Sequence, residues 1–271
     1  MIIDGNAIAH EIKERLKTAA ATRPDGFFGA VLVGDDPASI NFLKQKEKVA
    51  RELGIEFRLY QLSSDMSTDE LRAEIGRLAQ PKSCGAFIVQ LPLPAGVNRY
   101  YALNAIPKEK DVDCLTEQAL GAFYTERGLI APPSVGTVEE ILKLEHRNLR
   151  ELKVVMVGAG FLIGKPVGFW LQNKVAELVV LDVTVKDIHS KLADADIVIS
   201  GVGKANLFGA QHLKDEATVI DFGFNKIDEK IIGDFDPSGA EEKNIHYTKT
   251  PGGTGPILVA KLFENFYTLG Y

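Results

Sequence analysis

The sequence predicts an α/β protein with mainly parallel sheets, divided into two α/β domains with a cleft between them. Three observations support this prediction. Short β-branched runs alternate with stretches long enough for a crossover helix. The segment 115–150 contains APPSVG but no strand-like run, and it separates two series of strands. At 271 residues the chain has room for two domains of ordinary size.

The strand-like runs define the two domains. They lie at 29–34, 57–62 and 85–91 before the strand-free segment, and at 153–158, 178–182, 196–203 and 218–223 after it. A final helix is predicted at about 256–268. We therefore expect a first domain of residues 1–118, completed by the C-terminal helix of about 256–271, and a second domain of residues 119–255.

Charge and cysteine content restrict the partners and the compartment. The 31 basic and 37 acidic residues give a net charge of −6, which favours neither nucleic acid nor an anionic membrane as a partner. Cys84 and Cys114 lie far apart, without metal-ligand spacing. The first residues do not resemble a secretory leader, and the apolar runs are strand-sized. These features predict a cytoplasmic protein without a metal site.

The helix predicted at about 37–53 contains a lysine on its apolar face. Asp36 is the expected N-cap, Pro37 lies in the first turn, and Gly54 ends the helix. At 100° per residue, the apolar side chains lie within about 60° of Lys46, whereas the other two lysines lie roughly 160° away. One interpretation is that the Lys46 stem crosses apolar surface to reach water. The other is that this face lines a cleft, where a desolvated lysine with a lowered pKa could exchange protons or orient a substrate.

A glycine-rich turn follows the predicted strand 153–158. Gly158, Gly160 and Gly164 have the spacing G-x-G-x-x-x-G, one residue longer than the dinucleotide fingerprint. Such a turn lets the backbone approach a pyrophosphate at a helix N-terminus. Asp182 ends the next strand, 24 residues after Gly158, where a carboxylate can bind the adenosine ribose. We predict a Rossmann-like dinucleotide site here, with a purely structural use of the glycines as the alternative.

The following strands complete this prediction and indicate the cofactor. ADIVISGVGK and TVIDFGFN supply two more strands with glycine turns, which adds Gly203 and Phe224 to the expected cofactor site. The cofactor is therefore predicted to be NAD or NADP. An acidic residue at the end of the second strand repels the 2′-phosphate of NADP, and no basic residue lies between Leu178 and Val185. NAD is the expected preference.

Several motifs together resemble one enzyme family over the whole chain. They occur in the order and spacing of the bifunctional methylenetetrahydrofolate dehydrogenase/methenyltetrahydrofolate cyclohydrolase family. The motifs are VGDDPAS before the Lys46 helix, VQLPLP (89–94), IPKEKDVD (106–113), GKP (164–166), VIDFGFN (219–225), GD (233–234) and TPGGTGP (250–256).

The resemblance implies an activity, a substrate and an assembly. Members of this family oxidise 5,10-methylenetetrahydrofolate by hydride transfer to a nicotinamide cofactor. They then hydrolyse the methenyl product to 10-formyltetrahydrofolate, in one-carbon metabolism and purine biosynthesis. The resemblance implies that this chain is a homodimer that binds a tetrahydrofolate derivative in the cleft between its domains.

The resemblance also implies individual site residues. The family's catalytic lysine, the glutamine of V-Q-L-P-L-P and the second aspartate of K-D-V-D correspond to Lys46, Gln90 and Asp113. By this resemblance the lysine stabilises charge or activates water at the methenyl carbon, the glutamine holds the lysine in position, and the aspartate accepts hydrogen bonds from the pterin ring. The substrate contacts are expected to include Phe42, Pro251, Gly252, Gly253 and Leu258.

The chain departs from the family pattern at several of these positions. Phe42 replaces a tyrosine four residues before the lysine, which predicts weakened or absent hydrolysis with retained hydride transfer. Cys114 and Leu258 replace a glycine and a threonine, and APPSVG (131–136) replaces P-C-T-P-x-G. Two departures fall among the predicted cofactor contacts, namely Ala159-Gly160 after the first glycine and LDVT, which contains Thr184.

These departures leave two alternative functions open. One is an NAD-dependent enzyme that acts on another small substrate. The other is a non-catalytic NAD-binding paralogue. Retention of Lys46, Gln90 and Asp113 argues against both, because a chain without catalytic duty has no physical need for a lysine on an apolar helix face.

Overall fold

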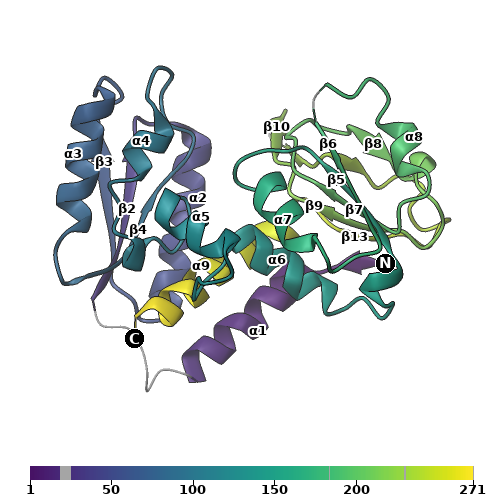
Figure 1. Cartoon of the computed structure of the whole chain (residues 1–271), viewed down its shortest axis with the longest axis horizontal. Coiled ribbons are helices and arrows are strands. Elements are labelled where there is room, and N and C mark those ends of the chain that lie inside the picture. The colour runs from purple at the N-terminus through teal and green to yellow at the C-terminus, as the bar shows by residue number, and fades with distance from the viewer. Residues whose placement is uncertain (19–25, 183, 229, 271) are drawn as a thin grey trace. The chain divides into compact units, whose positions relative to one another are not determined.

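The computed structural model describes residues 1–18, 26–182, 184–228 and 230–270, and they form two compact units (Figure 1). Unit 1 comprises Met1–His10 and Ser134–Leu258. Unit 2 comprises Glu11–Pro133 and Val259–Tyr271. The units differ from the predicted domains in three places: residues 1–10 and 256–258 belong to unit 1, and residues 119–133 belong to unit 2.

Unit 1 contains a six-stranded sheet in which every pairing is parallel. Its strands, in spatial order, are β1 (Ile2–Ile3), β13 (His246–Thr248), β9 (Thr218–Asp221), β7 (Ile197–Ser200), β5 (Lys153–Val157) and β6 (Glu177–Leu181). The chain runs from β5 outward to β6, then returns to β7 on the other side of β5. The strand order therefore reverses between β5 and β7, the place where open α/β sheets bind ligands.

Helices and short strands complete unit 1. The helices are α1 (Gly5–Thr18, which continues into unit 2), α6 (Pro133–Leu142), α7 (Gly164–Leu171) and α8 (His189–Leu192), with 3₁₀ turns at Leu149–Glu151 and Ala210–His212. Two small pairings lie outside the main sheet: β8 (Phe208–Gly209) is parallel to β12 (Phe235–Asp236), and β10 (Asn225–Ile227) is antiparallel to β11 (Lys230–Ile232). The residues of β7 and β9 are fully buried, as expected for central parallel strands.

Unit 2 is built on a three-stranded parallel sheet. Its strands, in spatial order, are β3 (Phe57–Leu62), β2 (Phe27–Val33) and β4 (Cys84–Val89). Its helices are α2 (Pro37–Glu52), α3 (Thr68–Ala79), α4 (Arg99–Leu103), α5 (Glu117–Tyr124) and most of α9 (Thr254–Leu269), with a 3₁₀ turn at Lys108–Lys110. Phe28 of β2 packs against Phe263 and Phe266 of α9, with ring centroids 5.0 and 5.8 Å apart. The last helix therefore supplies part of the core around the central strand.

The predicted fold class, two α/β domains with mainly parallel sheets, is confirmed. Each predicted strand is present, shifted by one to three residues at some ends, and no strand lies between 115 and 150. The short strands β1, β8 and β10 to β13 were not predicted, because runs of two or three residues show no periodicity. Among the helices formed by the described residues, none has the length and hydropathy needed to cross a bilayer.

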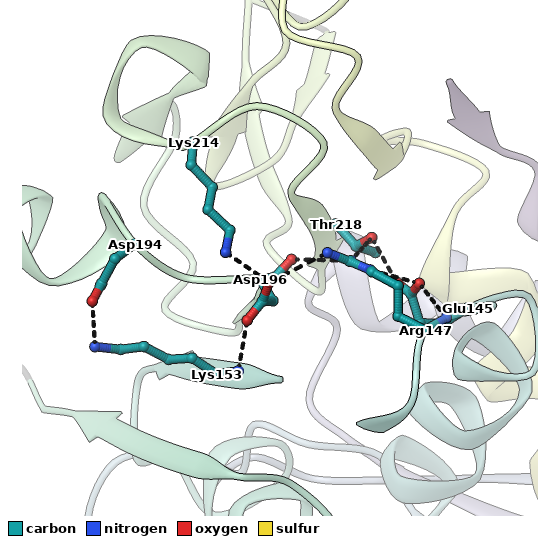
Figure 2. A network of polar contacts seen from close by, with 7 residues as sticks. All are labelled: Glu145, Arg147, Lys153, Asp194, Asp196, Lys214 and Thr218. Carbon is teal, nitrogen blue, oxygen red and sulfur yellow. Dashed lines mark hydrogen bonds and ion pairs between the residues drawn. The ribbon is translucent and has the colours of Figure 1, made fainter. Parts of the chain in front are cut away.

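A polar network ties the segment after α6 to the first residues of three parallel strands (Figure 2). Arg147 donates to both carboxylate oxygens of Glu145, each at 2.8 Å, and lies 3.4 Å from Asp196 Oδ1. Asp196 also accepts from the backbone N–H of Lys153 at 2.7 Å and from Lys214 Nζ at 2.6 Å. Thr218 Oγ1 donates to Glu145 at 3.1 Å, and Lys153 Nζ pairs with Asp194 at 2.9 Å. The network therefore joins the starts of β5, β7 and β9.

Glu145 is predicted to make the stability of unit 1 pH-dependent. Hydrogen bonds from Arg147 hold the pKa of Glu145 at about 2, below its ordinary value of 4.5. A depressed carboxyl pKa stabilises the folded state above about pH 4.5, and this contribution is lost as the pH falls toward 2. We expect Glu145→Gln to lower the free energy of unfolding by on the order of 2–3 kcal/mol at pH 6 to 7, with the difference shrinking below pH 4.5.

The measurement is urea unfolding followed by fluorescence. Trp170 is the sole tryptophan of the sequence and lies in α7, so its emission reports on unit 1. Glu177→Gln is the matched control, because Glu177 pairs with Lys153 at 3.2 Å but is 56% exposed. An exposed ion pair should contribute less than about 1 kcal/mol to the free energy of unfolding. An equal decrease in the free energy of unfolding in the two variants would contradict the prediction.

Candidate active site

Helix α2 places Lys46 on the face that packs against the sheet of unit 2. Asp36 caps the helix by accepting from the Ser39 N–H at 2.7 Å, as the sequence predicted. Leu43 and Ala50 are buried on this face, whereas Lys44 and Lys48 are exposed. Lys46 is partly buried. Periodicity therefore predicted which of the three lysines of this helix is partly buried.

The Lys46 ammonium has a defined partner. Its Nζ donates to Gln90 Oε1 at 2.9 Å, and Gln90 Nε2 donates to the carbonyl of Leu91 at 2.7 Å. Gln90 follows β4, and its backbone N–H still continues the sheet by donating to the Val31 carbonyl at 2.9 Å. Because both ends of the amide are engaged, Gln90 holds its oxygen toward Lys46.

Asp113 lies at the end of a turn that its neighbours stabilise. The buried Asp111 carboxylate accepts from the backbone N–H groups of Leu115 and Thr116, at 3.0 and 2.8 Å. Lys110 donates to the carbonyls of residues 79–81 at the end of α3. Asn265 of α9 donates to the Val112 carbonyl at 2.8 Å. In the motif KEKDVD, Lys110 and Asp111 therefore stabilise the loop. The charge of Asp113 instead influences Lys46.

The charges of Lys46 and Asp113 influence each other. Burial lowers the pKa of the Lys46 ammonium, and the Asp113 carboxylate opposes this with a smaller effect. Burial likewise raises the pKa of Asp113, with Lys46 opposing it. Both shifts favour the neutral forms of the two groups.

Phe42 lies one turn before Lys46 on α2 and is half-buried. A residue four positions before a lysine occupies the same helix face. Four of the predicted site residues, Phe42, Lys46, Gln90 and Asp113, are thus in unit 2, and hydrogen bonding or charge links the last three. Cys114 follows with a positive φ of 58°, a backbone conformation that favours glycine.

The glycine turn of unit 1 lies at the point where the strand order reverses. Gly158 ends β5 with φ of 99°, and its N–H donates to the Leu181 carbonyl of β6 at 2.8 Å. Gly164 starts α7, where a Cβ would collide with the Gly158 carbonyl. By contrast, a Cβ at Gly160 would meet no atom within 4 Å. Close packing explains Gly158 and Gly164, whereas Gly160 and the adjacent Ala159 leave open space beside the turn.

The other predicted cofactor residues lie at the same edge of the sheet. Val157 pairs with Leu181, so Gly158 and Asp182 leave neighbouring strands side by side. Gly203 follows β7 with φ of 73°, and Phe224 follows β9. Asp182 and Thr184 are exposed, and Val183 between them lies outside the described residues. Among the described side chains none caps α7, but the N–H groups of Lys165 and Val167 already donate to the backbone carbonyls of Gly160 and Ile163, and Pro166 has no N–H.

The predicted substrate residues of the motif TPGGTGP belong to unit 1. Pro251, Gly252 and Gly253 form the loop between β13 and α9, and Leu258 lies half-buried in the first turns of α9. A Cβ at Gly253 would lie 2.5 Å from the Lys249 carbonyl, so the loop needs glycine there. Two buried aspartates nearby, Asp221 and Asp234, lie in the motifs VIDFGFN and GD, but the sequence alone gave them no individual role.

A parallel sheet with a glycine turn at its strand-order reversal defines an α/β protein of the dinucleotide-binding class. Comparison with protein families extends this result to both units. The NAD(P)-binding domain of tetrahydrofolate dehydrogenase/cyclohydrolase matches residues 132–270, and the catalytic domain of the same enzymes matches residues 3–113. The chain belongs to the tetrahydrofolate dehydrogenase/cyclohydrolase family.

Individual relatives resemble the chain over nearly its full length. The bifunctional protein FolD of Cupriavidus necator is 35% identical, with 97% of this chain and 95% of the relative covered. The crystal structure of the Campylobacter jejuni bifunctional enzyme is 31% identical with a TM-score of 0.92, covering 100% and 98%. The Trypanosoma brucei enzyme, solved with NADP and an inhibitor, is 28% identical with a TM-score of 0.93, covering 100% and 97%.

The different surroundings of the glycines give a testable prediction. We expect Gly164→Ala to lower the free energy of unfolding of unit 1 by about 2 kcal/mol or more, because the methyl group collides with backbone. Gly160→Ala, the matched control, should change it by less than about 1 kcal/mol. Urea unfolding monitored by Trp170 fluorescence measures both. A destabilised Gly160→Ala variant would show that open space does not surround that residue.

Proposed function

We propose that the protein oxidises 5,10-methylenetetrahydrofolate by hydride transfer to NAD(P), and that it hydrolyses the methenyl product to 10-formyltetrahydrofolate slowly or not at all. The observation that carries this proposal is the hydrogen bond between Lys46 and Gln90, with Asp113 acting on the same ammonium. The comparisons support the substrate class, because relatives named as dehydrogenase/cyclohydrolase match the chain over nearly its whole length.

Lys46 and Gln90 would act on the folate carbon. A desolvated ammonium stabilises negative charge, and the lowered pKa of Lys46 makes it a better proton donor than a lysine in water. The Gln90 amide keeps the lysine in one position, which reduces the reorganisation needed during the reaction. Asp113 would accept hydrogen bonds from the pterin ring in its ionised form, or donate one when protonated.

Phe42 limits the second reaction. Its ring can stack on or pack against the folate, but it has no hydroxyl to relay a proton to or from Lys46. General acid–base assistance is typically worth ~10²–10⁴-fold in rate. Hydride transfer depends mainly on positioning, so it should tolerate the loss of this hydroxyl better than hydrolysis does.

Unit 1 would hold the nucleotide, whose nicotinamide ring accepts the hydride. Gly158, Ala159 and Gly160 would let the backbone approach the pyrophosphate at the start of α7. Asp182 would accept hydrogen bonds from the adenosine ribose, close to Thr184. A carboxylate in this place disfavours a 2′-phosphate, so we propose that NAD is preferred to NADP.

An assay with both nucleotides tests the proposal. Purified protein should convert methylenetetrahydrofolate to the methenyl form, which is followed by absorbance, with kcat/KM at least tenfold higher for NAD than for NADP. No hydride transfer with either nucleotide would favour the non-catalytic paralogue, and NAD reduction with another substrate would favour the second alternative. A preference for NADP would contradict only the role proposed for Asp182, and the proposed oxidation would stand.

Two variants separate the steps of the reaction. Phe42→Tyr restores a hydroxyl, so it should raise methenyltetrahydrofolate hydrolysis at least tenfold without a large change in nucleotide affinity. Lys46→Met keeps the apolar stem and removes the ammonium, so it should abolish hydrolysis while the protein stays folded. A large loss of stability in Lys46→Met would show instead that the lysine has a structural role. Wild-type hydrolysis equal to that of Phe42→Tyr would show that the hydroxyl is dispensable.

The homodimer, the cytoplasmic location and the link to purine biosynthesis stay predictions from the family resemblance. One structural feature supports self-association, because β3 is an edge strand and its Leu59 is 49% exposed. Light scattering of the purified protein would decide between a monomer and a dimer.

A further inference from the structure

Two buried aspartates that the proposed reaction does not use lie at the carboxyl edge of the unit 1 sheet. Asp221 is the last residue of β9 and is 2% exposed, and Asp234 precedes β12 and is fully buried. Carboxylates are rarely buried without strong partners. Their partners therefore indicate what these residues do.

Asp234 holds the loop that follows β7. Its carboxylate accepts from Ser200 Oγ at 2.6 Å, from the backbone N–H groups of Val202 and Lys204 at 2.8 Å each, and from that of Gly203 at 3.4 Å. One side chain thus binds the end of the strand and three consecutive residues of the loop. Hydrogen bonds to an ionised acceptor are about twice as strong as neutral ones, so the shape of the loop depends on this carboxylate.

Asp221 supports the segment that carries Asp234. Its carboxylate accepts from the N–H groups of Gly223 at 2.6 Å and Phe235 at 3.0 Å. The two carboxylates also explain the neighbouring glycines, because a Cβ at Gly223 would collide with Asp234 and a Cβ at Gly233 would collide with Asp221. Burial and the Asp234 carboxylate raise the pKa of Asp221 to about 7. A protonated Asp221 lowers the repulsion between the two groups.

The loop fixed by Asp234 faces the glycine turn across the strand-order reversal. A Cβ at Gly158 would lie 3.2 Å from both the Gly201 carbonyl oxygen and Val202 Cγ2. A Cβ at Gly201 would lie 3.0 Å from Ile163 Cγ2, just before α7. The two loops are therefore in contact, so movement of one displaces the other.

We propose that Asp234, supported by Asp221, is a positioning residue for the nicotinamide nucleotide. It keeps the loop 201–204 in the shape that forms one wall of the nucleotide site opposite the glycine turn. This inference rests on the proposed function, because it names residues that organise the same nucleotide site. Asp234 itself does not touch the nucleotide and acts through the backbone of residues 202–204.

The direct test is Asp234→Asn, which keeps the shape of the side chain. The amide has one acceptor oxygen, and its NH₂ group faces N–H donors that the carboxylate accepted. We expect the Kd for NADH, measured by the fluorescence of the nucleotide, to rise at least tenfold. The KM for NAD should rise similarly, whereas the KM for methylenetetrahydrofolate should change less than twofold. A variant that is merely less stable would not show this division between the two substrates.

Ser200→Ala provides a milder second variant if Asp234→Asn does not fold. It removes one of the four donors to Asp234 and should raise the Kd for NADH about threefold or more. Ser238→Ala is the matched control, because Ser238 Oγ also donates to an aspartate, Asp236, at 2.8 Å, but on the exposed surface. It should leave the Kd within twofold. Circular dichroism and Trp170 fluorescence confirm that each variant is folded.

The outcomes separate this inference from the proposed function. If the unaltered protein binds neither NADH nor NADPH, the proposed function fails and the inference fails with it. If the unaltered protein binds the nucleotide and a folded Asp234→Asn or Ser200→Ala variant binds it equally well, the inference alone is wrong. A higher Kd in both variants but not in Ser238→Ala supports it.

Discussion

Parallel strand pairing is the constraint on which both units depend. When neighbouring strands run in one direction, their carboxyl ends meet at one edge, and the loops that leave them become neighbours. In unit 1 this places Gly158, Asp182 and Gly203 at one edge, although they are distant in sequence. In unit 2 the same rule places Gln90, which follows β4, next to the end of β2 and close to the helix that bears Lys46. The loops that carry the predicted site residues therefore become neighbours because of strand pairing, and contacts between the loops are not needed to bring them together.

Charged side chains in this protein are stabilised by nearby hydrogen-bond and ion-pair partners, and the net charge of the protein has little effect on them. The total of −6 gives no strong field, and several charged side chains have their own donors or acceptors. Arg147 holds Glu145, Lys110 binds three carbonyls at the end of a helix, and Asp234 accepts from four groups. The Lys46 ammonium, by contrast, has an amide and a carboxylate that compensate burial only in part. The pKa of Lys46 therefore stays below its ordinary value.

Much of the fold could be read from the sequence because buried parallel strands and amphipathic helices have distinct periods. The cap at Asp36 and the orientation of Lys46 followed from the same reasoning. The pairing of β1 with β13 could not, since two residues carry no period and the contact joins opposite ends of the chain. The roles of Asp221 and Asp234 could not be predicted from their motifs, because most of their donors are backbone N–H groups that depend on loop shape. The roles of Phe42, Lys46, Gln90 and Asp113 come from resemblance to the family, and the structure adds the hydrogen bonds and charges around them.

The final helix has a consequence for how the protein is made. Helix α9 starts in unit 1 and continues in unit 2, where Phe263 and Phe266 pack on Phe28. During synthesis Phe28 leaves the ribosome long before Phe263 and Phe266. The central strand of unit 2 therefore emerges with part of its apolar surface uncovered. Unit 2 cannot close its core until α9 has been synthesised. Its folding therefore waits for α9, and a product truncated before this helix would expose the apolar surface that marks a chain for chaperones or proteases.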